Sequence, residues 1–260
     1  MPTPITVMPS ADDIGETVAQ RILDGLAGDD TFVVGFPAGR SATPVAVALD
    51  RLAHEQGVRV DNLKVVMMDE YVTGHAGKWR LLSPHTPHSC IGWAQRNLLA
   101  PLRDLGATSR SLIAPDPNQP GAFERAVRAE GGIDLFLLAS GQGDGHVALN
   151  GPGTPREART RVVSLPESTR RDNQSTFPHL RSLGDVPTHG VTIGTAELAA
   201  LSHSVLMLLW GPNKSYAFDR ISHATGYDPA WPATIVHDCR NPQIYADHEA
   251  AQSARREGVS

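Results

Sequence analysis

The segment at residues 140–150 carries the residue types that most clearly could do chemistry. It reads Ser-Gly-Gln-Gly-Asp-Gly-His-Val-Ala-Leu-Asn, so Asp144 and His146 stand two positions apart among glycines, directly after an apolar run. A carboxylate beside an imidazole can fix its tautomer and orientation, as a general acid–base requires. The glycines permit close approach of the backbone to a ligand. A lone histidine is more often structural, but its place in this segment favours a catalytic role.

Two adjacent acids, Asp69 and Glu70, directly follow the apolar run at residues 64–68. Strand interiors exclude unpaired charge, so acids at this place need a partner or a ligand. Successive residues of a strand point to opposite sides, and at most one of the two acids can therefore face a ligand. The alternative is structural, namely a helix cap or a buried ion pair.

Two further segments suit a bound phosphate. Residues 35–44 form a small-residue loop before a predicted helix, where backbone N–H groups and the hydroxyls of Ser41 and Thr43 can hold an anion. The loop lacks the lysine of a P-loop and the glycine spacing of a dinucleotide site, so a plain tight turn is the alternative. Lys214 lies at the start of a predicted helix, an unfavourable place for a cation without an anion, and Arg170 lies in a polar loop.

The surrounding elements place these segments at one edge of a sheet. Continuous apolar runs predict buried strands at residues 31–36, 64–68, 133–139 and 204–210. Amphipathic patterns or prolines predict helices from Ser10, from Pro44, and near residues 90–102, 122–129 and 214–223.

This alternation predicts an α/β fold: a doubly wound, mostly parallel, open Rossmann-like sheet with helices on both faces, in a single domain over residues 1–260. Ligands of such sheets bind beyond the carboxyl ends of the strands. The loops at residues 72–88 and 225–233 are rich in Gly, Pro, His and Trp, and we expect them to cover the site as lids.

The composition narrows the class of protein. The chain has 260 residues, 40% of them hydrophobic, and a net charge of −5 with scattered basic residues, which argues against disorder and against nucleic-acid binding. Its longest apolar run, residues 205–210, is far shorter than the roughly 20 residues of a membrane span. The two cysteines and the absence of a signal-like N-terminus predict a cytoplasmic protein. The eleven histidines show no metal-ligand spacing, so no metal site is expected.

Taken in order, five motifs make the sequence resemble the glucosamine-6-phosphate deaminase family, which shares a superfamily with 6-phosphogluconolactonase. They are the loop at 35–44, Met-Asp-Glu-Tyr-Val at 68–72, the histidine segment at 141–150, Thr-Arg at 169–170 and Gly-Pro-Asn-Lys-Ser at 211–215. The resemblance runs from about residue 10 to about residue 250. Asn150 favours the deaminase branch, because lactonases usually read Asp-Gly-His-x-Ala-Ser-Leu-Phe at the corresponding place.

The resemblance implies a reaction and a set of roles. An amino-sugar phosphate becomes fructose 6-phosphate and ammonia through an enolamine, without a cofactor. Asp69 moves a proton between C1 and C2 of the opened sugar, and His146, supported by Asp144, opens the pyranose ring. The residues implied for the 6-phosphate are Gly39 through its backbone, Ser41, Thr43, Arg170 and Lys214. The implied partners are a small-molecule sugar phosphate and further copies of the chain, with no nucleic acid and no membrane.

Two departures from the family pattern keep alternatives open. Gly151 stands where the family normally has a glutamate that completes a carboxylate–histidine–carboxylate group, and the first loop is longer and carries Arg40. The alternatives are a lactonase-type hydrolase in which His146 activates water, an isomerase for a different sugar phosphate, and a non-catalytic sugar-phosphate sensor. A sensor of this kind usually has a DNA-binding segment ahead of the sheet, and here the sheet is expected to begin almost at residue 1.

Overall fold

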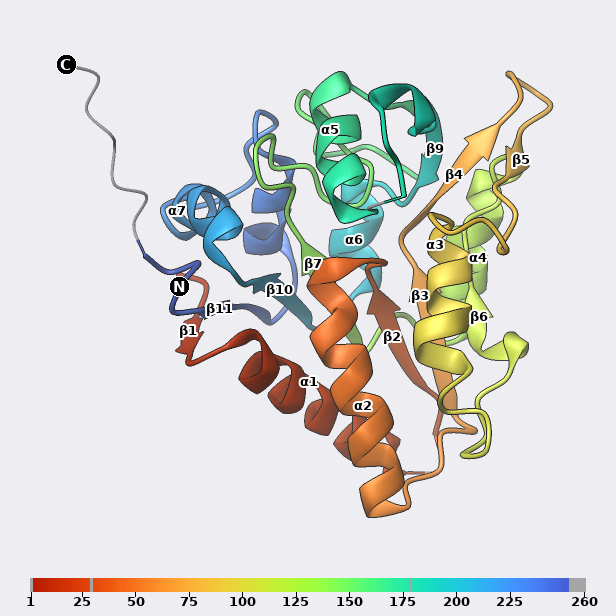
Figure 1. The fold of residues 1–260 in the computed structure, drawn as a ribbon, viewed down its shortest axis with the longest axis vertical. Coiled ribbons are helices and arrows are strands. Elements are labelled where there is room, and N and C mark those ends of the chain that lie inside the picture. The colour runs from red at the N-terminus through yellow and green to blue at the C-terminus, as the bar shows by residue number, and fades with distance from the viewer. Residues whose placement is uncertain (1, 29, 178, 253–260) are drawn as a thin grey trace.

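The centre of the molecule is a seven-stranded parallel sheet (Figure 1). We describe it from a computed structural model, which covers residues 2–28, 30–177 and 179–252. The strand order is β1-β11-β10-β7-β2-β3-β6. The strands are β1 (Ile5–Met8), β2 (Phe32–Phe36), β3 (Leu63–Met67), β6 (Leu112–Ile113), β7 (Leu135–Ala139), β10 (Val205–Leu209) and β11 (Pro242–Asp247).

The four predicted strands form the contiguous centre of this sheet, in the order β10-β7-β2-β3. Apart from the half-buried Lys64 in β3, their residues are apolar because helices cover both faces, which confirms the predicted fold class. On one face, Val34 belongs to a core that contains residues of α1 (Ala11–Leu26), α2 (Thr43–Gln56) and α3 (Cys90–Ala94). On the other, Val33 belongs to a core built with α4 (Pro120–Ala129), α6 (Thr195–Leu201) and α7 (Ser215–Ser222).

The predicted helix starts are also present. The Ser10 hydroxyl accepts a hydrogen bond from the Asp13 backbone N–H at 3.2 Å and so caps α1, and Pro44 lies in the first turn of α2. The helix expected at residues 90–102 is α3 followed by a π-helical turn at Gln95–Leu99. No helix in the described part of the chain combines the length and the hydrophobicity that a membrane span needs.

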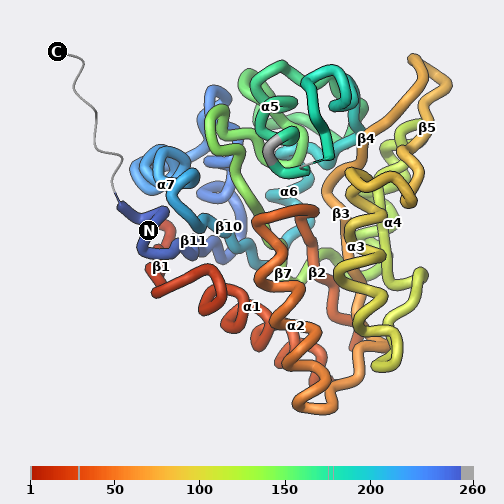
Figure 2. Tube along the Cα trace, viewed as in Figure 1, coloured from red at the N-terminus to blue at the C-terminus, as the bar shows by residue number. Residues whose placement is uncertain are grey.

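A second sheet of four antiparallel strands was not predicted. Its order is β5-β4-β9-β8, and its strands are β4 (Asp69–Thr73), β5 (Arg80–Leu81), β8 (Arg161–Ser164) and β9 (His189–Thr192). These strands are short and several of their residues are polar, so they lack the continuous hydrophobicity of the central strands. Figure 2 traces the chain from β3 directly into β4. Figure 1 places β4, β9 and α5 (Glu167–Thr176) beyond the carboxyl ends of β2 and β3.

Close packing at the middle of the large sheet generates a stability prediction. A Cβ atom added at Gly35 in β2 would lie 2.1 Å from Cδ2 of Phe136, a fully buried side chain of the paired strand β7. We expect Gly35→Ala to lower the free energy of unfolding by about 1–3 kcal/mol, because the ring must move. Urea denaturation followed by circular dichroism measures the change.

Gly28→Ala is the matched control, since the nearest atom to its added Cβ is 4.0 Å away. Equal urea midpoints for the two variants would contradict the prediction and show that the Phe136 ring can move aside without a loss of stability.

Candidate active site

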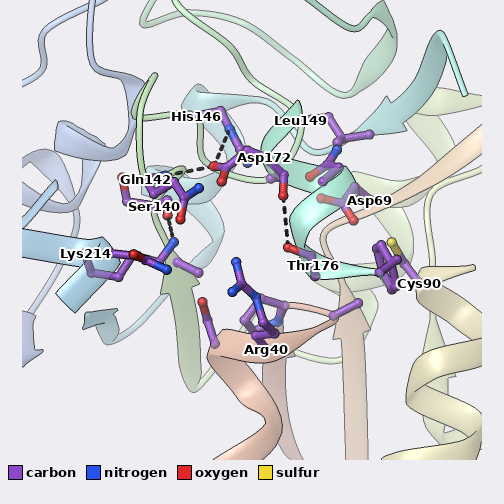
Figure 3. Close-up of a pocket in the computed structure, with 18 of the residues that line it drawn as sticks. Arg40, Asp69, Cys90, Ser140, Gln142, His146, Leu149, Asp172, Thr176 and Lys214 are labelled. Atoms are coloured by element: carbon purple, nitrogen blue, oxygen red, sulfur yellow. Dashed lines mark hydrogen bonds and ion pairs between the residues drawn. The ribbon is translucent and has the colours of Figure 1, made fainter. Parts of the chain in front are cut away.

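A cavity of about 180 Å³ lies at the carboxyl edge of the large sheet (Figure 3). Its walls come from the loops after β2, β7 and β10, from β4, from the start of α3 and from one face of α5. This is where ligands of open α/β sheets bind. Contrary to expectation, residues 72–88 and 225–233 do not line it. Part of the first segment is held in the β4–β5 pair, and Trp231 of the second is buried against Gly145.

His146 is held by Asp144 at one side of the cavity. Nδ1 of His146 lies 2.6 Å from Oδ1 of Asp144, and Oδ2 of Asp144 accepts hydrogen bonds from the hydroxyls of Ser168 at 3.0 Å and Thr169 at 2.6 Å. Burial works to raise the pKa of Asp144, but the hydrogen bonds from His146 and Thr169 and the histidine's charge outweigh it and lower that pKa. Asp144 is therefore a fixed negative partner for the imidazole. His146 Nε2 is the ring nitrogen left to serve a ligand.

Asp172 is a second carboxylate beside His146 that the sequence analysis missed. Its Oδ2 lies 3.9 Å from His146 Nδ1 and accepts a hydrogen bond from the Gln142 backbone N–H at 2.8 Å. Burial works to lower the pKa of His146, but the hydrogen bond to Asp144 and the charges of Asp144 and Asp172 raise it overall. The imidazolium form is thus favoured without a glutamate at position 151. We interpreted the segment around residue 170 as a loop, but it forms the helix α5. On a helix, residues three apart such as Thr169 and Asp172 lie on the same face, and this spacing was the signal for Asp172 in the sequence.

Asp144, His146 and Asp172 each bring one potential ligand atom within 4.8 Å of the others, a grouping that can hold a metal ion. The donors around it suit an acid–base pair instead. Asp144 already accepts from the imidazole and from two hydroxyls, and Lys214 lies close enough for both carboxylates to act on its pKa. A cation at this place would displace those donors and face an ammonium group.

Asp69 and Glu70 point to opposite sides, as predicted for neighbours in a strand. Glu70 is fully buried and accepts hydrogen bonds from the Ser89 hydroxyl at 2.6 Å and from the backbone N–H groups of Cys90 and Ile91 at 3.1 and 2.9 Å. Glu70 thus caps the start of α3, and Asp69 lines the cavity. The structural interpretation holds for Glu70, and Asp69 stays the candidate for the functional one.

Burial raises the pKa of Asp69 to about 7. A hydrogen bond with Cys90 and the charge of His146 oppose the shift, and the charge of Glu70 adds to it. A carboxyl group with this pKa takes up and releases protons near neutral pH, which is what a general base in a reversible proton transfer requires.

Two cations, Arg40 and Lys214, also line the cavity. Arg40 and Ser41 come from the loop after β2, and Lys214 comes from the turn after β10, where its Nζ donates a hydrogen bond to the Ser140 carbonyl. Burial lowers the pKa of Lys214, and the charge of Arg40 lowers it further, which places the two cations near each other. Like charges in a partly buried site favour a bound anion. Thr43 does not line the cavity; its hydroxyl donates to the Gly39 carbonyl at 3.1 Å and so supports the turn.

The structure corrects the expectation for Arg170. This side chain donates hydrogen bonds to the backbone carbonyls of Leu183 and Val186 and does not line the cavity. The cause is helix geometry, because Arg170 and Asp172 are two residues apart on α5 and so point to opposite faces. Arg40 supplies the cation that was expected from Arg170. The extra residues in its loop were visible in the sequence as a departure from the family pattern.

Two buried amide atoms of the cavity wall lack a hydrogen-bond partner within the described residues. They are Oε1 of Gln142 and Nδ2 of Asn173, and both side chains line the cavity. A buried polar group without a partner is costly, so such atoms are suited to bind a ligand. One accepts and the other donates, which matches the hydroxyl groups of a sugar.

The sequence is similar to proteins named glucosamine-6-phosphate deaminase. That of Beutenbergia cavernae is 33% identical over 253 residues, covering 95% of this chain and 91% of that protein. That of Arthrobacter sp. is 32% identical over 216 residues, covering 82% and 78%. That of Bacillus pumilus is 30% identical over 243 residues, covering 92% and 95%. No family model matches the sequence.

Solved structures share the fold. A monomeric glucosamine-6-phosphate deaminase matches with a TM-score of 0.84 at 24% identity, over 96% of this chain and 99% of that one. The 6-phosphogluconolactonase from Leishmania guyanensis matches with a TM-score of 0.65 at 17% identity, over the full length of both chains. The architecture of the chain is therefore that of both groups of proteins.

The placement of the two arginines predicts that only one of them contributes to anion binding. We expect Arg40→Met to weaken the binding of inorganic phosphate about 10- to 100-fold, because a charge-assisted contact is lost. Arg170→Met should leave the phosphate Kd unchanged and lower the free energy of unfolding by about 1–2 kcal/mol, because its carbonyl partners lose their donor. Titration calorimetry and urea denaturation measure the two quantities. Equal losses of affinity in both variants would contradict the placement of the anion beside Arg40.

Proposed function

The chain belongs to the glucosamine-6-phosphate deaminase family, and we propose that it converts glucosamine 6-phosphate and water into fructose 6-phosphate and ammonia. The observation that carries the proposal is the content of one cavity. It combines a carboxyl group with a pKa of about 7 (Asp69), an imidazole with two carboxylates beside it (His146), and two cations.

The phosphate end sets the register of the substrate. Arg40, Ser41 and Lys214 hold the 6-phosphate, and the other end of the sugar then reaches the acid–base groups. Fixing both ends lets a bound sugar sit in a near-attack geometry, which accounts for a large part of the rate in such reactions. The unpartnered amide atoms of Gln142 and Asn173 take hydroxyl groups between the two ends.

Ring opening falls to His146. Its Nδ1 is engaged by Asp144, so Nε2 of the imidazolium donates its proton to the ring oxygen. The hydroxyl at C1 gives up its proton to solvent water as C1 becomes an aldehyde. The neighbouring charges of Asp144 and Asp172 keep the imidazole protonated before this step.

Proton transfer falls to Asp69. The carboxylate removes the proton from C2 of the open-chain aldehyde while a water molecule gives a proton to the oxygen at C1, which yields an enolamine with a double bond between C1 and C2. Returning the proton to C1 gives an imine at C2, and water then replaces the nitrogen there, releasing ammonia and leaving the ketone. One carboxylate serves both proton transfers because C1 and C2 are adjacent on one face of a planar intermediate.

We further propose that the enzyme works in the cytoplasm. Both cysteines, Cys90 and Cys239, are buried and unpaired, which supports a reducing compartment. Assembly with further copies of the chain stays a prediction from the family resemblance.

Proton exchange at C2 tests the reaction directly. We expect glucosamine 6-phosphate in D₂O to take up deuterium and to release ammonia in the same sample, followed by NMR and an ammonia assay. Asp69→Asn should reduce both about 10²- to 10⁴-fold, because the amide cannot accept the proton. It should leave the Kd for the open-chain amino alcohol 6-phosphate nearly unchanged, since Asp69 does not contact the phosphate.

The other outcomes separate the alternatives. Exchange without ammonia would replace deamination by isomerisation of a sugar that keeps its substituent. If neither deuterium uptake nor ammonia release is seen, and a phosphorylated sugar lactone is hydrolysed, the reaction is that of a lactonase. Phosphate-sugar binding with no turnover of any substrate would leave a sensor.

The charge of Asp172 predicts a change in the pH dependence. Asp172→Asn removes a charge that raises the pKa of His146, so the imidazolium is lost at lower pH. The alkaline limb of kcat/KM should therefore move to lower pH, because kcat/KM falls where the imidazole loses its proton. Glu167→Gln, an exposed carboxylate on the same helix, is the control. An unmoved alkaline limb in Asp172→Asn would remove Asp172 from ring opening.

A further inference from the structure

We propose that Trp231 is a positioning residue for ring opening: its indole packs against the backbone of Gly145 and so fixes the orientation of His146. This inference rests on the proposed function, in which His146 donates the proton that opens the sugar ring. Trp231 belongs to the segment at residues 225–233, which the sequence led us to expect as a lid. It does not line the cavity, and it contacts the loop of the histidine from outside the cavity.

The contact between Trp231 and Gly145 is close. Gly145 has a left-handed φ of 65°, which favours glycine, and a Cβ atom added there would lie 2.2 Å from Cδ2 and 2.4 Å from Cγ and Cε2 of the indole. The buried indole therefore occupies the space that a side chain at position 145 would need. Two residues further along the chain, the Ala233 backbone N–H donates a hydrogen bond to the Gly145 carbonyl at 2.8 Å. One short segment thus holds Gly145 through two separate contacts.

Gly145 matters for the chemistry because it joins Asp144 to His146. Oδ1 of Asp144 accepts a hydrogen bond from the His146 backbone N–H at 3.2 Å and lies 2.6 Å from Nδ1 of the imidazole. Both contacts span Gly145, so they require its backbone angles to stay as they are. A rotation of the Gly145 backbone would move the carboxylate and the imidazole apart. Packing by the indole opposes that rotation, because a well-packed ring leaves no room for it.

The indole is braced in turn by α7, the helix that follows Lys214. The Tyr216 ring meets the indole edge-on, with ring centroids 5.2 Å apart and planes at 89°. The guanidinium carbon of Arg220 lies 5.4 Å from the indole centroid, and Nη2 of Arg220 lies 3.1 Å from Oδ2 of Asp228. Lys214, which binds the phosphate in the proposed function, directly precedes this helix. Trp231 therefore connects the loop of the proton donor to the element that follows the phosphate-binding cation.

The charged groups around His146 make its pKa a measure of this positioning. Burial works to lower the pKa of His146, and the hydrogen bond and charge of Asp144 help to raise it overall. The charge of Asp172 on α5 also raises it, and the charge of Lys214 lowers it. Asp69 on β4 interacts electrostatically with the imidazole as well. A looser contact with Asp144 therefore lowers the pKa of His146, and the imidazolium is then lost at lower pH.

Two substitutions at position 231 test the proposal. Trp231→Leu removes the flat ring from Gly145, so the contact with Asp144 loosens and the alkaline limb of kcat/KM should move to lower pH by about half to one unit. Its kcat for glucosamine 6-phosphate should fall about 3- to 30-fold, while the Kd for inorganic phosphate stays unchanged because Arg40 and Lys214 are intact. Trp231→Phe keeps an aromatic face at this place and should keep the alkaline limb. The indole N–H has no hydrogen-bond partner among the residues that the structure describes, so its loss in Trp231→Phe breaks no such contact.

Phe123→Leu is the matched control for the loss of a buried ring. Phe123 lies on α4, belongs to the same core as Trp231 and does not line the cavity. Its substitution should lower the free energy of unfolding and leave the pH profile in place. An unmoved alkaline limb in Trp231→Leu, or an equal shift in Phe123→Leu or in Trp231→Phe, would overturn the proposal, since the flat ring on Gly145 would then have no role of its own.

Titration of His146 itself makes the test independent of turnover. NMR of the ¹³C-labelled imidazole ring reports its pKa in each variant without a substrate. Trp231→Leu should lower that pKa, and this shift would support the proposal even if glucosamine 6-phosphate were not the substrate. An unchanged His146 titration in Trp231→Leu would overturn the positioning role and leave the proposed reaction untouched.

Gly145→Ala tests the same contact from the other side, without removing a core side chain. The added Cβ meets the indole, so this variant should also lower the pKa of His146. In the Trp231→Leu background the same substitution should cause a smaller further shift, because both changes disturb one contact. An unchanged pKa in Gly145→Ala, or equal shifts in the two backgrounds, would overturn the role of Trp231.

Discussion

The structure depends on giving two adjacent buried carboxyl groups different surroundings. Asp69 and Glu70 lie where the chain leaves the parallel sheet for the second sheet, and both are removed from water. Glu70 accepts strong hydrogen bonds from Ser89 and from the first N–H groups of α3, so its charge is compensated by the helix start. Asp69 instead lines the cavity, where burial raises its pKa to about 7. Glu70 therefore has a structural role, and Asp69, the residue before it in the same strand, is available as a base.

The second sheet holds Asp69 and Glu70 in these two orientations. β4 continues directly from β3, and its pairing with β9 fixes which of the two acids faces the cavity. A shift of one residue in this register would exchange Asp69 and Glu70. The helix α5, whose Phe177 end packs on the same small core as Tyr71, brings Asp172 to the opposite wall. The base Asp69 and the carboxylate Asp172 are therefore set by two elements that share one core.

The sequence allowed the centre of the fold to be predicted and left its periphery undetermined. Continuous hydrophobicity is a strong signal for strands covered on both faces, and it located β10, β7, β2 and β3. It fails for the second sheet, because strands with polar residues are decided by tertiary pairing. At the site, residues next to the ends of central strands were found in advance, among them Asp69, His146 and Lys214. Residues on α5 were misjudged because the segment is strongly polar and reads as a loop.

The distance over which an interaction acts explains which site groups must come from a fixed sequence position and which can be supplied from another part of the chain. A hydrogen bond requires about 3 Å and a fixed direction, so Asp144 keeps its place two residues before His146 and contacts it at 2.6 Å. A charge acts over several ångströms with little directional demand, and Asp172 influences the imidazole from 3.9 Å. The second carboxylate can therefore come from α5 instead of position 151, where a side chain would first meet Pro166. A positive charge is likewise effective from more than one position. Arg40 in the loop after β2 can therefore supply the cation that the family resemblance placed at Arg170 on α5.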